Sequence, residues 1–195
     1  NEFKTTADEL KKIGNKLINL KKKNKVAILY SHDSYHALNF MPYTYKENYP
    51  IDRVYKALYM QNIETDIVPC DKWIDFSQYT MLVIPPLYVA TDELLSGIDK
   101  FVKEGGHVVM LHKSGYCNEH SAVRATLAPG LLRKACGFYY QEYSTIDAMP
   151  LRDNPYNIED SNQISDWYEF LQLETAKPLA YANHPFFGKW PVITE

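Results

Sequence analysis

Short apolar runs alternate with helical stretches up to residue 111, and this alternation restricts the fold more than any other feature of the chain. The runs are rich in β-branched residues and short enough to be strands buried on both faces. They cover residues 25–30 (KVAILY), 65–68, 80–84 and 107–111. Strands joined through helices form right-handed crossover units. The alternation therefore predicts an α/β fold with helices on both faces of a mostly parallel sheet, in the flavodoxin-like or Rossmann-like manner.

The segments between these runs carry helical signals of different kinds. Residues 6–20 and 51–62 each place apolar side chains on one face at helical spacing. Thr91 is a suitable N-cap for the next helix, because acidic residues fill its first turn and a glycine pair follows its end. A short helix is expected over residues 130–136, closed by Gly137.

Three other segments lack that periodicity. Residues 31–50 are expected to be a loop after the first strand. Residues 147–165 are polar and contain two prolines, which indicates an irregular excursion. Residues 192–194 are apolar and β-branched, and they predict a final strand.

The carboxyl ends of parallel strands are where such folds gather functional groups. Six side chains at these ends are candidates for the rim of a substrate pocket: His32, Asp33, Tyr35, His36, Tyr88 and His112. The spacing of His32, Asp33 and His36 is also one that a metal ion can use. A hydrogen-bonded rim is the favoured interpretation of this cluster, so no metal is predicted.

Composition narrows the classes of function. The net charge is −3, from 21 Lys and Arg against 24 Asp and Glu, which predicts no general nucleic-acid surface. No apolar run reaches the roughly 18 residues of a membrane span. The only glycine pair, Gly105-Gly106, precedes a strand and so does not form the usual dinucleotide cradle, and no cofactor is predicted. Three widely spaced cysteines favour a reducing compartment, the cytoplasm, with the periplasm as the alternative.

Cys117 is the strongest candidate for a nucleophile. It follows the fourth apolar run and a turn, as does the nucleophilic cysteine of amidotransferase-like folds. The second glycine of a G-x-C-x-G elbow is missing, however, because Glu119 stands there. His184 is followed by Pro185, so no His-x-Glu pair supplies a base late in the chain. An amidotransferase-like hydrolase therefore remains an alternative to a chain without catalytic residues.

Several segments together resemble a known family. In order, they are KVAILYSHDSYHAL, a long stretch from DIVPCDKWID to MLHKSGYCNE, RATLAPGLLRKACGF and WYEFLQLETAKPLAYANHPFFGKWPVITE. They are similar to the middle domain of family-forty-two β-galactosidases, in which a catalytic (β/α)8 barrel precedes a flavodoxin-like trimerisation domain and a small β domain follows. The family's D-W-[DE]-[NS]-W-W-A loop corresponds to residues 31–37, where His32, Tyr35 and His36 replace the tryptophans.

The resemblance implies a layout and a role. Residues 1–24 would be a helix and linker from an upstream barrel, and residues 25–195 a flavodoxin-like trimerisation domain, also described as class I glutamine amidotransferase-like. The family's catalytic glutamates belong to the barrel, so no catalytic residue is expected in this chain. The implied partners are the upstream barrel and downstream β domain of the same protein, two further copies in a homotrimer, and a galactoside reached through the parent. A free-standing sugar-binding module using Tyr35, His36 and Tyr88 is a third possibility.

Overall fold

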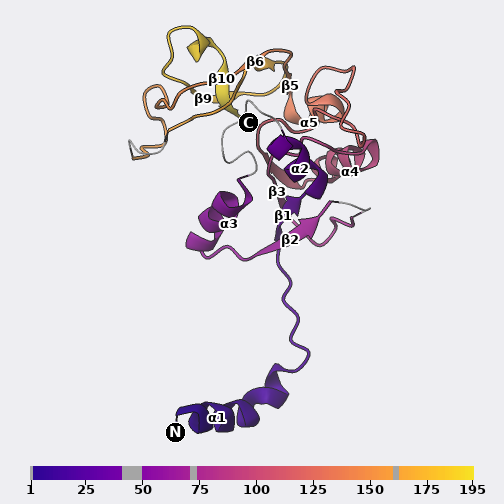
Figure 1. Cartoon of the computed structure of the whole chain (residues 1–195), viewed down its shortest axis with the longest axis vertical. Helices are drawn as coiled ribbons and strands as arrows, with labels where there is room; N and C mark the ends of the chain where they lie inside the picture. The colour runs from indigo at the N-terminus through magenta and orange to yellow at the C-terminus, as the bar shows by residue number, and fades with distance from the viewer. Residues whose placement is uncertain (1, 41–49, 71–73, 160–162) are drawn as a thin grey trace.

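A parallel sheet of four strands forms the centre of the computed structural model, which describes residues 2–40, 50–70, 74–159 and 163–195. Its strands are β1 (Val26–Tyr30), β2 (Thr65–Pro69), β3 (Met81–Ile84) and β4 (His107–Met110), in the order β2-β1-β3-β4 (Figure 1). Every neighbouring pair is parallel. The four predicted strands and the flavodoxin-like α/β class are confirmed.

Two of the predicted helices lie on opposite sides of this sheet, as Figure 1 shows for α3 (Ile51–Met60) and α4 (Asp92–Lys103). The Thr91 side chain accepts a hydrogen bond from the Leu94 amide at 3.1 Å, which confirms the predicted cap. Helix α4 buries Leu95 and Ile98 against the sheet, together with Leu29 and other strand residues. Burial of each such side chain contributes about 1.5–3 kcal/mol, so this interface is the main core of the domain.

The prediction of a loop directly after β1 is wrong for its first part, because α2 (His32–Phe40) begins there. Ser31 caps this helix: its hydroxyl accepts the Ser34 amide at 3.0 Å. The hydroxyl of Ser34 in turn donates to the Val89 carbonyl oxygen at 3.0 Å and fixes the helix on the sheet edge. The helix has few apolar residues, so periodicity did not mark it. The rest of the predicted loop is residues 41–50, of which all but Pro50 lie outside the described residues.

The sheet face on the α3 side is incompletely covered. The strand register places Ile67, Ile28, Val83 and Val109 in one row across it. The two middle side chains are buried, whereas Ile67 and Val109 at the edges are 52% and 39% exposed. Helix α3 itself buries no residue completely. An apolar surface therefore remains open on this side.

Short elements after the sheet build a second layer at its carboxyl end. A 3-10 turn η1 (Gly130–Leu132) leads into α5 (Arg133–Cys136), which ends at Gly137 with a left-handed φ of 68°, as predicted. Antiparallel pairs follow between β5 (Phe138–Tyr139) and β8 (Gln172–Leu173), and between β6 (Tyr143–Ser144) and β7 (Tyr168–Glu169). The predicted final strand lies within β10 (Pro191–Thr194), which pairs with β9 (Pro178–Tyr181) after the turn η2 (Phe187–Lys189).

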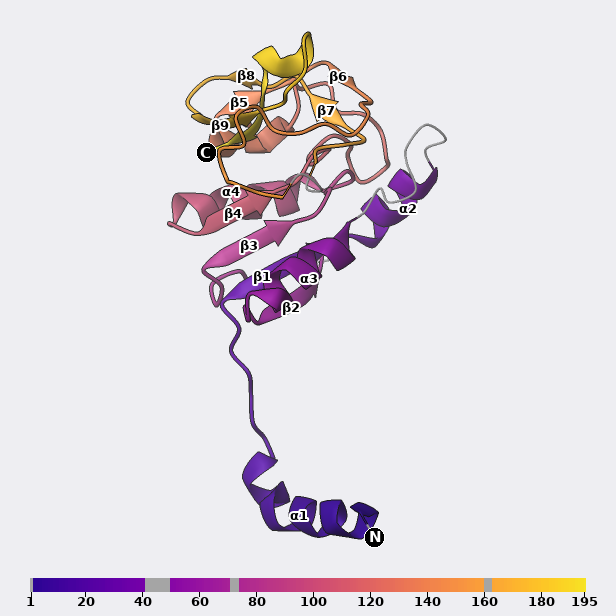
Figure 2. The same cartoon turned by 90° about the vertical axis from the view of Figure 1, so that its left-hand side faces the viewer.

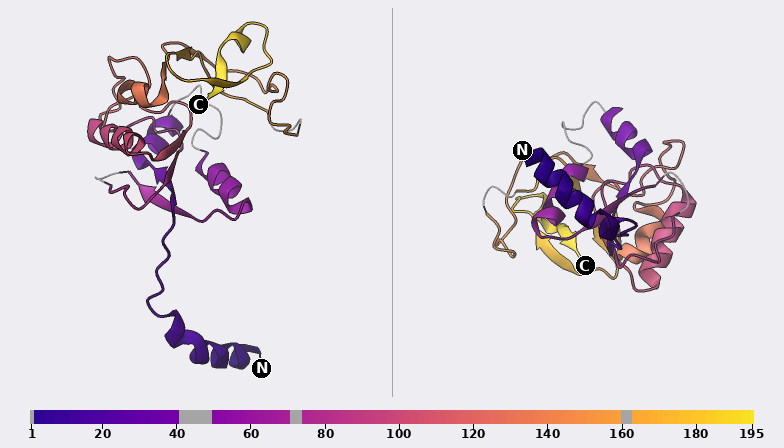
Figure 3. Two further views of the ribbon diagram at one scale, coloured as in Figure 1. Left: turned by 180° about the vertical axis from the view of Figure 1, so that it is seen from behind. Right: turned by 90° about the horizontal axis from the view of Figure 1, so that it is seen from below.

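The first helix, α1 (Glu2–Leu17), stands away from everything else at the end of an extended segment (Figures 2 and 3). It begins four residues before the predicted start at residue 6 and stops before the predicted end at residue 20. None of its residues is buried, and the apolar stripe that predicted it is open: Leu10, Ile13 and Leu17 are 55%, 45% and 50% exposed. Among the described residues, no helix combines the length and apolar character that crossing a membrane requires.

Candidate functional site at the carboxyl end of the sheet

Four of the six predicted rim residues come from α2 and lie together. His32 and His36 are one helical turn apart, and their Nε2 atoms are separated by 3.0 Å. The Tyr30 hydroxyl lies 3.1 Å from Nδ1 of His32. Tyr35 contacts both imidazoles, with ring centroids 6.5 Å from His32 and 5.4 Å from His36. Asp33 is in the same first turn, and all four side chains are exposed.

Tyr88 is not part of this exposed group. It is only 8% exposed and packs beneath α2 with Leu38 and Cys117. Its ring stacks on Tyr116 at 5.5 Å, and Tyr116 meets Tyr143 edge-on. Tyr143 then stacks on Trp167 at 4.3 Å. Tyr88, which was predicted to lie at the rim, is therefore the buried end of a row of aromatic rings. Little of its ring is accessible to a ligand.

His112 is also separated from the α2 histidines. No ring contact or hydrogen bond found among the described residues joins it to His32 or His36. It is half-buried at the end of β4, where burial, with the Lys113 charge in second place, lowers the pKa of His112 to about 4. The expectation that it lines one cleft with His32 finds no support in the geometry.

The residue after His112 begins a buried polar cluster that sequence reasoning missed. Lys113 has a left-handed φ of 59° and is 3% exposed. Its backbone amide donates to Oε1 of Glu169 at 2.6 Å, and Nε1 of Trp167 donates to the same oxygen at 3.2 Å. The Lys113 ammonium lies 4.0 Å from the centroid of the Trp167 ring. Two segments 56 residues apart are thus joined by one carboxylate.

Burial dominates the titration of this cluster. It lowers the pKa of Lys113 to about 8, although Glu169 and Asp166 act in the opposite direction. It raises the pKa of Glu169, a shift that the Lys113 amide and the neighbouring donors oppose. Burial, followed by the charge of Glu169, also raises the pKa of Tyr140 well above its usual value. A cluster of this kind stabilises the joint between the sheet and the layer of short strands.

Cys117 has the environment of a structural cysteine. Its side chain is fully buried, and burial raises the pKa of its thiol. A nucleophilic cysteine needs a lowered pKa and access to substrate. After β4 the left-handed residues of this turn are Lys113 and Gly115, and Cys117 is not left-handed, so it does not occupy the elbow position that suggested a nucleophile. These observations weigh against an amidotransferase-like hydrolase.

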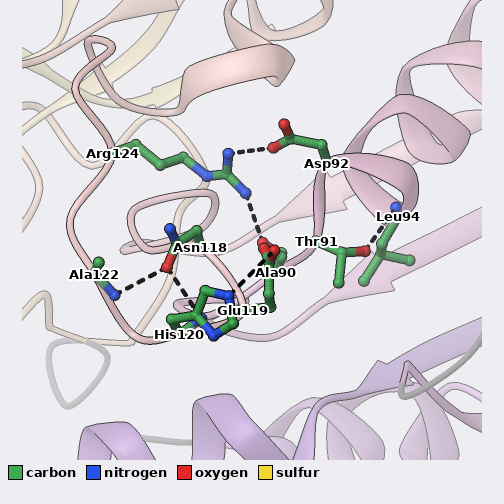
Figure 4. Close-up of polar contacts among 9 residues, drawn as sticks. All are labelled: Ala90, Thr91, Asp92, Leu94, Asn118, Glu119, His120, Ala122 and Arg124. Atoms are coloured by element: carbon green, nitrogen blue, oxygen red, sulfur yellow. Dashed lines mark hydrogen bonds and ion pairs between the residues drawn. The ribbon is translucent and has the colours of Figure 1, made fainter.

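The loop of residues 113–130 is anchored by the residues that carried the family resemblance. Ser114 is buried, and its hydroxyl accepts the Leu87 amide at 3.1 Å while donating to the Leu111 carbonyl oxygen at 2.9 Å. The Asn118 amide oxygen accepts the His120 and Ala122 amides, both at 3.0 Å, and closes a turn (Figure 4). These motif residues therefore fix the loop.

A tight backbone crossing holds the end of the same loop. Gly115 has a φ of +69°, and a Cβ atom built on it would lie 2.5 Å from the Pro129 carbonyl oxygen. Gly130, which follows Pro129, has a φ of +65° and faces the Gly115 carbonyl oxygen. The two backbones therefore pass closely: a Cβ atom at position 115 would clash, and one at position 130 would lie 3.3 Å from the Gly115 carbonyl oxygen.

The arrangement contains contacts suited to structure and recognition. In the described part of the chain, no three His, Cys, Asp or Glu side chains converge as a metal site would need. The exposed His and Tyr side chains of α2 can contact a ligand or another subunit. The cluster around Glu169 joins the end of β4 to the layer of short strands.

Comparison with known proteins places this domain within longer relatives. A family model described as the β-galactosidase trimerisation domain matches residues 24–195. β-Galactosidase BgaA of Clostridium cellulovorans is 26% identical over 193 residues, which is 95% of this chain and 28% of that protein. β-Galactosidase BgaB of a Geobacillus species is 27% identical over 198 residues, 100% of this chain and 29% of that protein.

The solved structure of a β-galactosidase from Bacillus circulans sp. alkalophilus has the same fold, with a TM-score of 0.83 at 27% identity. That match covers 96% of this chain and 29% of the other. The chain spans less than a third of the length of these relatives.

Proposed function

The chain belongs to the family of β-galactosidase trimerisation domains, and we propose that it joins three copies of a β-galactosidase-type glycoside hydrolase. The observation that carries the proposal is the extent of the family match. The match begins at Asn24, where the extended segment ends and the folded domain starts, and it runs to residue 195. The catalytic groups of such an enzyme would belong to its barrel, and this chain would supply assembly.

The exposed stripe of α1 supports an upstream barrel. A helix whose apolar face meets only water is unstable by itself, so Leu10, Ile13 and Leu17 need a partner surface. The domain offers none to α1, which contributes no buried residue. Residues 1–24 would therefore pack on a preceding barrel and lead out of it, and residues 25–195 would form the trimerisation domain. A small β domain would follow.

The open side of the sheet offers a surface for assembly, which we call the α3 patch. It comprises Tyr55, Tyr59 and Met60 of α3 and Ile67 of β2, which are 43%, 66%, 66% and 52% exposed. Exposed apolar side chains gathered on one side of a domain mark candidate interaction sites. A closed three-fold ring uses a heterologous interface, so the patch of one copy would meet a different surface on the next.

The exposed side chains of α2 are placed where they could reach a substrate in the assembled enzyme. His32, Asp33, Tyr35 and His36 are exposed beyond the carboxyl end of β1, where ligand-facing groups of such sheets lie. In the trimer they would wall the sugar pocket of a neighbouring subunit's barrel. Tyr88 would support this wall from beneath, because it is buried and packs against Leu38 of α2.

Light scattering of the full-length protein over a concentration series tests the assembly. We expect a trimer, and a Tyr59→Glu variant should dissociate at concentrations where the parent stays assembled. The matched control is Phe186→Glu, which places the same charge at a side chain that is 76% exposed and outside the α3 patch. A monomeric parent would overturn the assembly role. An intact trimer in the Tyr59→Glu variant would show that the interface lies elsewhere.

Hydrolysis of a chromogenic galactoside by the full-length protein tests the substrate class separately. We expect cleavage with retention of the anomeric configuration. A trimer that cleaves no galactoside would keep the assembly role and remove the substrate.

A further inference from the structure

We propose that His32 and His36 form a two-histidine clamp for a divalent transition-metal ion, with Cu²⁺ or Ni²⁺ preferred and water completing the coordination. The proposal rests on the local geometry of α2 and is independent of the assembly role. Both imidazoles lie on the same exposed helix face, one turn apart, where an ion can approach from solvent.

The separation of the two nitrogens fits a metal in adjacent coordination positions. Their Nε2 atoms are 3.0 Å apart. An ion about 2.1 Å from each would subtend an angle of about 90° between them. That angle belongs to square-planar and octahedral sites, which suit Cu²⁺ and Ni²⁺. A tetrahedral Zn²⁺ site would need the nitrogens about 3.4 Å apart.

Metal binding here requires a change of tautomer and a turn of the imidazole rings that points both Nε2 lone pairs at the ion. At 3.0 Å the two Nε2 atoms share one proton, with one ring donating and the other accepting. Neutral imidazoles that carry their proton on Nδ1 leave both Nε2 lone pairs free for an ion. No oxidant or other reactant is involved, because the ring that donated through Nε2 carries its proton on Nδ1 instead.

Tyr30 supplies the outer contact that metal-binding histidines usually have. Its hydroxyl lies 3.1 Å from Nδ1 of His32, on the side of the ring away from His36. An oxygen in that position accepts the Nδ1 proton and orients the ring toward the ion. The edge-on packing of the two imidazoles, with centroids 4.4 Å apart, keeps their Nε2 atoms close before any ion arrives.

The clamp stands where the family resemblance leads one to expect tryptophan, so it gives this chain a chemistry that the indole rings could not supply. An indole has only a donor N–H and offers no lone pair to a cation. Replacement of two such rings by histidines at a spacing of four therefore converts an apolar surface into a pair of nitrogen ligands.

Carbethoxylation of individual histidines, measured by mass spectrometry on the full-length protein, tests the clamp directly. Increasing CuCl2 or NiCl2 should slow the modification of His32 and His36 together, with one shared midpoint. His120, whose side chain is 80% exposed, should keep its rate and serves as the internal control. In a His32→Gln variant, protection of His36 should need at least about tenfold more ion. A His120→Gln variant should leave the midpoint unchanged.

The Tyr30→Phe variant keeps the ring and removes the outer contact, and it should raise the midpoint by up to about tenfold. Unchanged circular dichroism of each variant would show that the fold survives. Protection of His36 at the same ion concentration in the parent and in His32→Gln would overturn the proposal, because a clamp needs both rings. Absence of protection at both histidines would overturn it as well.

Discussion

The guanidinium of Arg124 pairs with the carboxylate of Asp92 in the first turn of α4. Through its second terminal nitrogen it also donates to the Ala90 carbonyl oxygen at 2.6 Å. Figure 4 shows how these contacts join the loop after β4 to the start of the helix. The two partners are unequally placed, since the Arg124 side chain is 12% exposed and that of Asp92 is 73% exposed. The arginine thus acts as the anchor.

This inequality predicts unequal effects of mutation. Arg124→Ala should lower the free energy of unfolding by about 1–3 kcal/mol, because it leaves a buried carbonyl oxygen without its donor. Asp92→Asn should cost less than about 1 kcal/mol, as exposed ion pairs usually do. Urea unfolding of the two variants measures both values. Equal losses would show that the ion pair, and not the contact with Ala90, carries the stability.

Gly115→Ala should destabilise the domain by about 2 kcal/mol or more. The new Cβ would sit in a left-handed conformation and 2.5 Å from a backbone oxygen of Pro129. Gly14→Ala is the matched control, because nothing lies within 4 Å of a Cβ at that position in α1. The control should leave the thermal midpoint of the domain unchanged. A Gly115→Ala variant as stable as the parent would contradict the tight crossing.

Lys113→Met should remove a rise of stability with pH that the parent shows between about pH 8 and pH 10.5. The pKa of Lys113 is lowered from 10.5 to about 8 in the folded chain, so the unfolded chain binds more protons between these values. Parent stability should therefore rise with pH across this window, by about 3 kcal/mol in total relative to the variant. Unfolding measured at pH 7, 8.5 and 10 gives the two curves. Parallel curves would mean that Lys113 titrates normally.

Cys117 and Cys136 should resist alkylation by iodoacetamide at pH 8 until the chain unfolds. Cys117 is fully buried, and burial raises the pKa of Cys136 to about 12, so neither supplies a reactive thiolate. Mass spectrometry of each cysteine with and without urea makes the comparison. Rapid labelling of Cys117 in the folded chain would revive the amidotransferase-like alternative.

A chain that starts at residue 24, and so keeps the buried Asn24 and its hydrogen bond to Asp66, should unfold at the same urea concentration as the full 195 residues. Helix α1 contributes no buried residue, so its removal costs the core nothing. Solubility should improve, because the open stripe of Leu10, Ile13 and Leu17 is gone. Circular dichroism during urea titration and a solubility curve provide the two readouts. A lower midpoint would show that α1 supports the domain.

Local sequence signals predicted the regular part of the fold. Strand β1 is a compact apolar run, and α4 has both a threonine cap and acidic residues in its first turn. Both signals depend on neighbouring residues only. Helix α2 was not predicted, because its stability comes from the Ser31 cap and from the hydrogen bond of Ser34 to the Val89 carbonyl oxygen. The second contact joins residues that are distant in the sequence.

The site was predicted less completely for the same reason. The exposed group on α2 could be found because its members are neighbours in the sequence. The cluster of Lys113 and Glu169 could not, since no local pattern tells that a glutamate 56 residues later will accept the lysine amide. Tyr88 was placed at the correct strand end, but its burial depends on how α2 packs over it.

The carboxylate of Glu169 has a consequence for anyone who grafts this domain onto another enzyme. It accepts hydrogen bonds from the Lys113 backbone amide and from the Trp167 indole, so it connects the sheet to the layer of short strands. A chimera joined between these layers would contain Glu169 without the Lys113 amide that donates to it, or that amide without Glu169. The extended segment before β1 is joined to the core mainly at its end, where the buried Asn24 amide donates to Oδ1 of Asp66 at 2.7 Å. A graft of this domain should therefore start at residue 24 and keep residues 24–195 together.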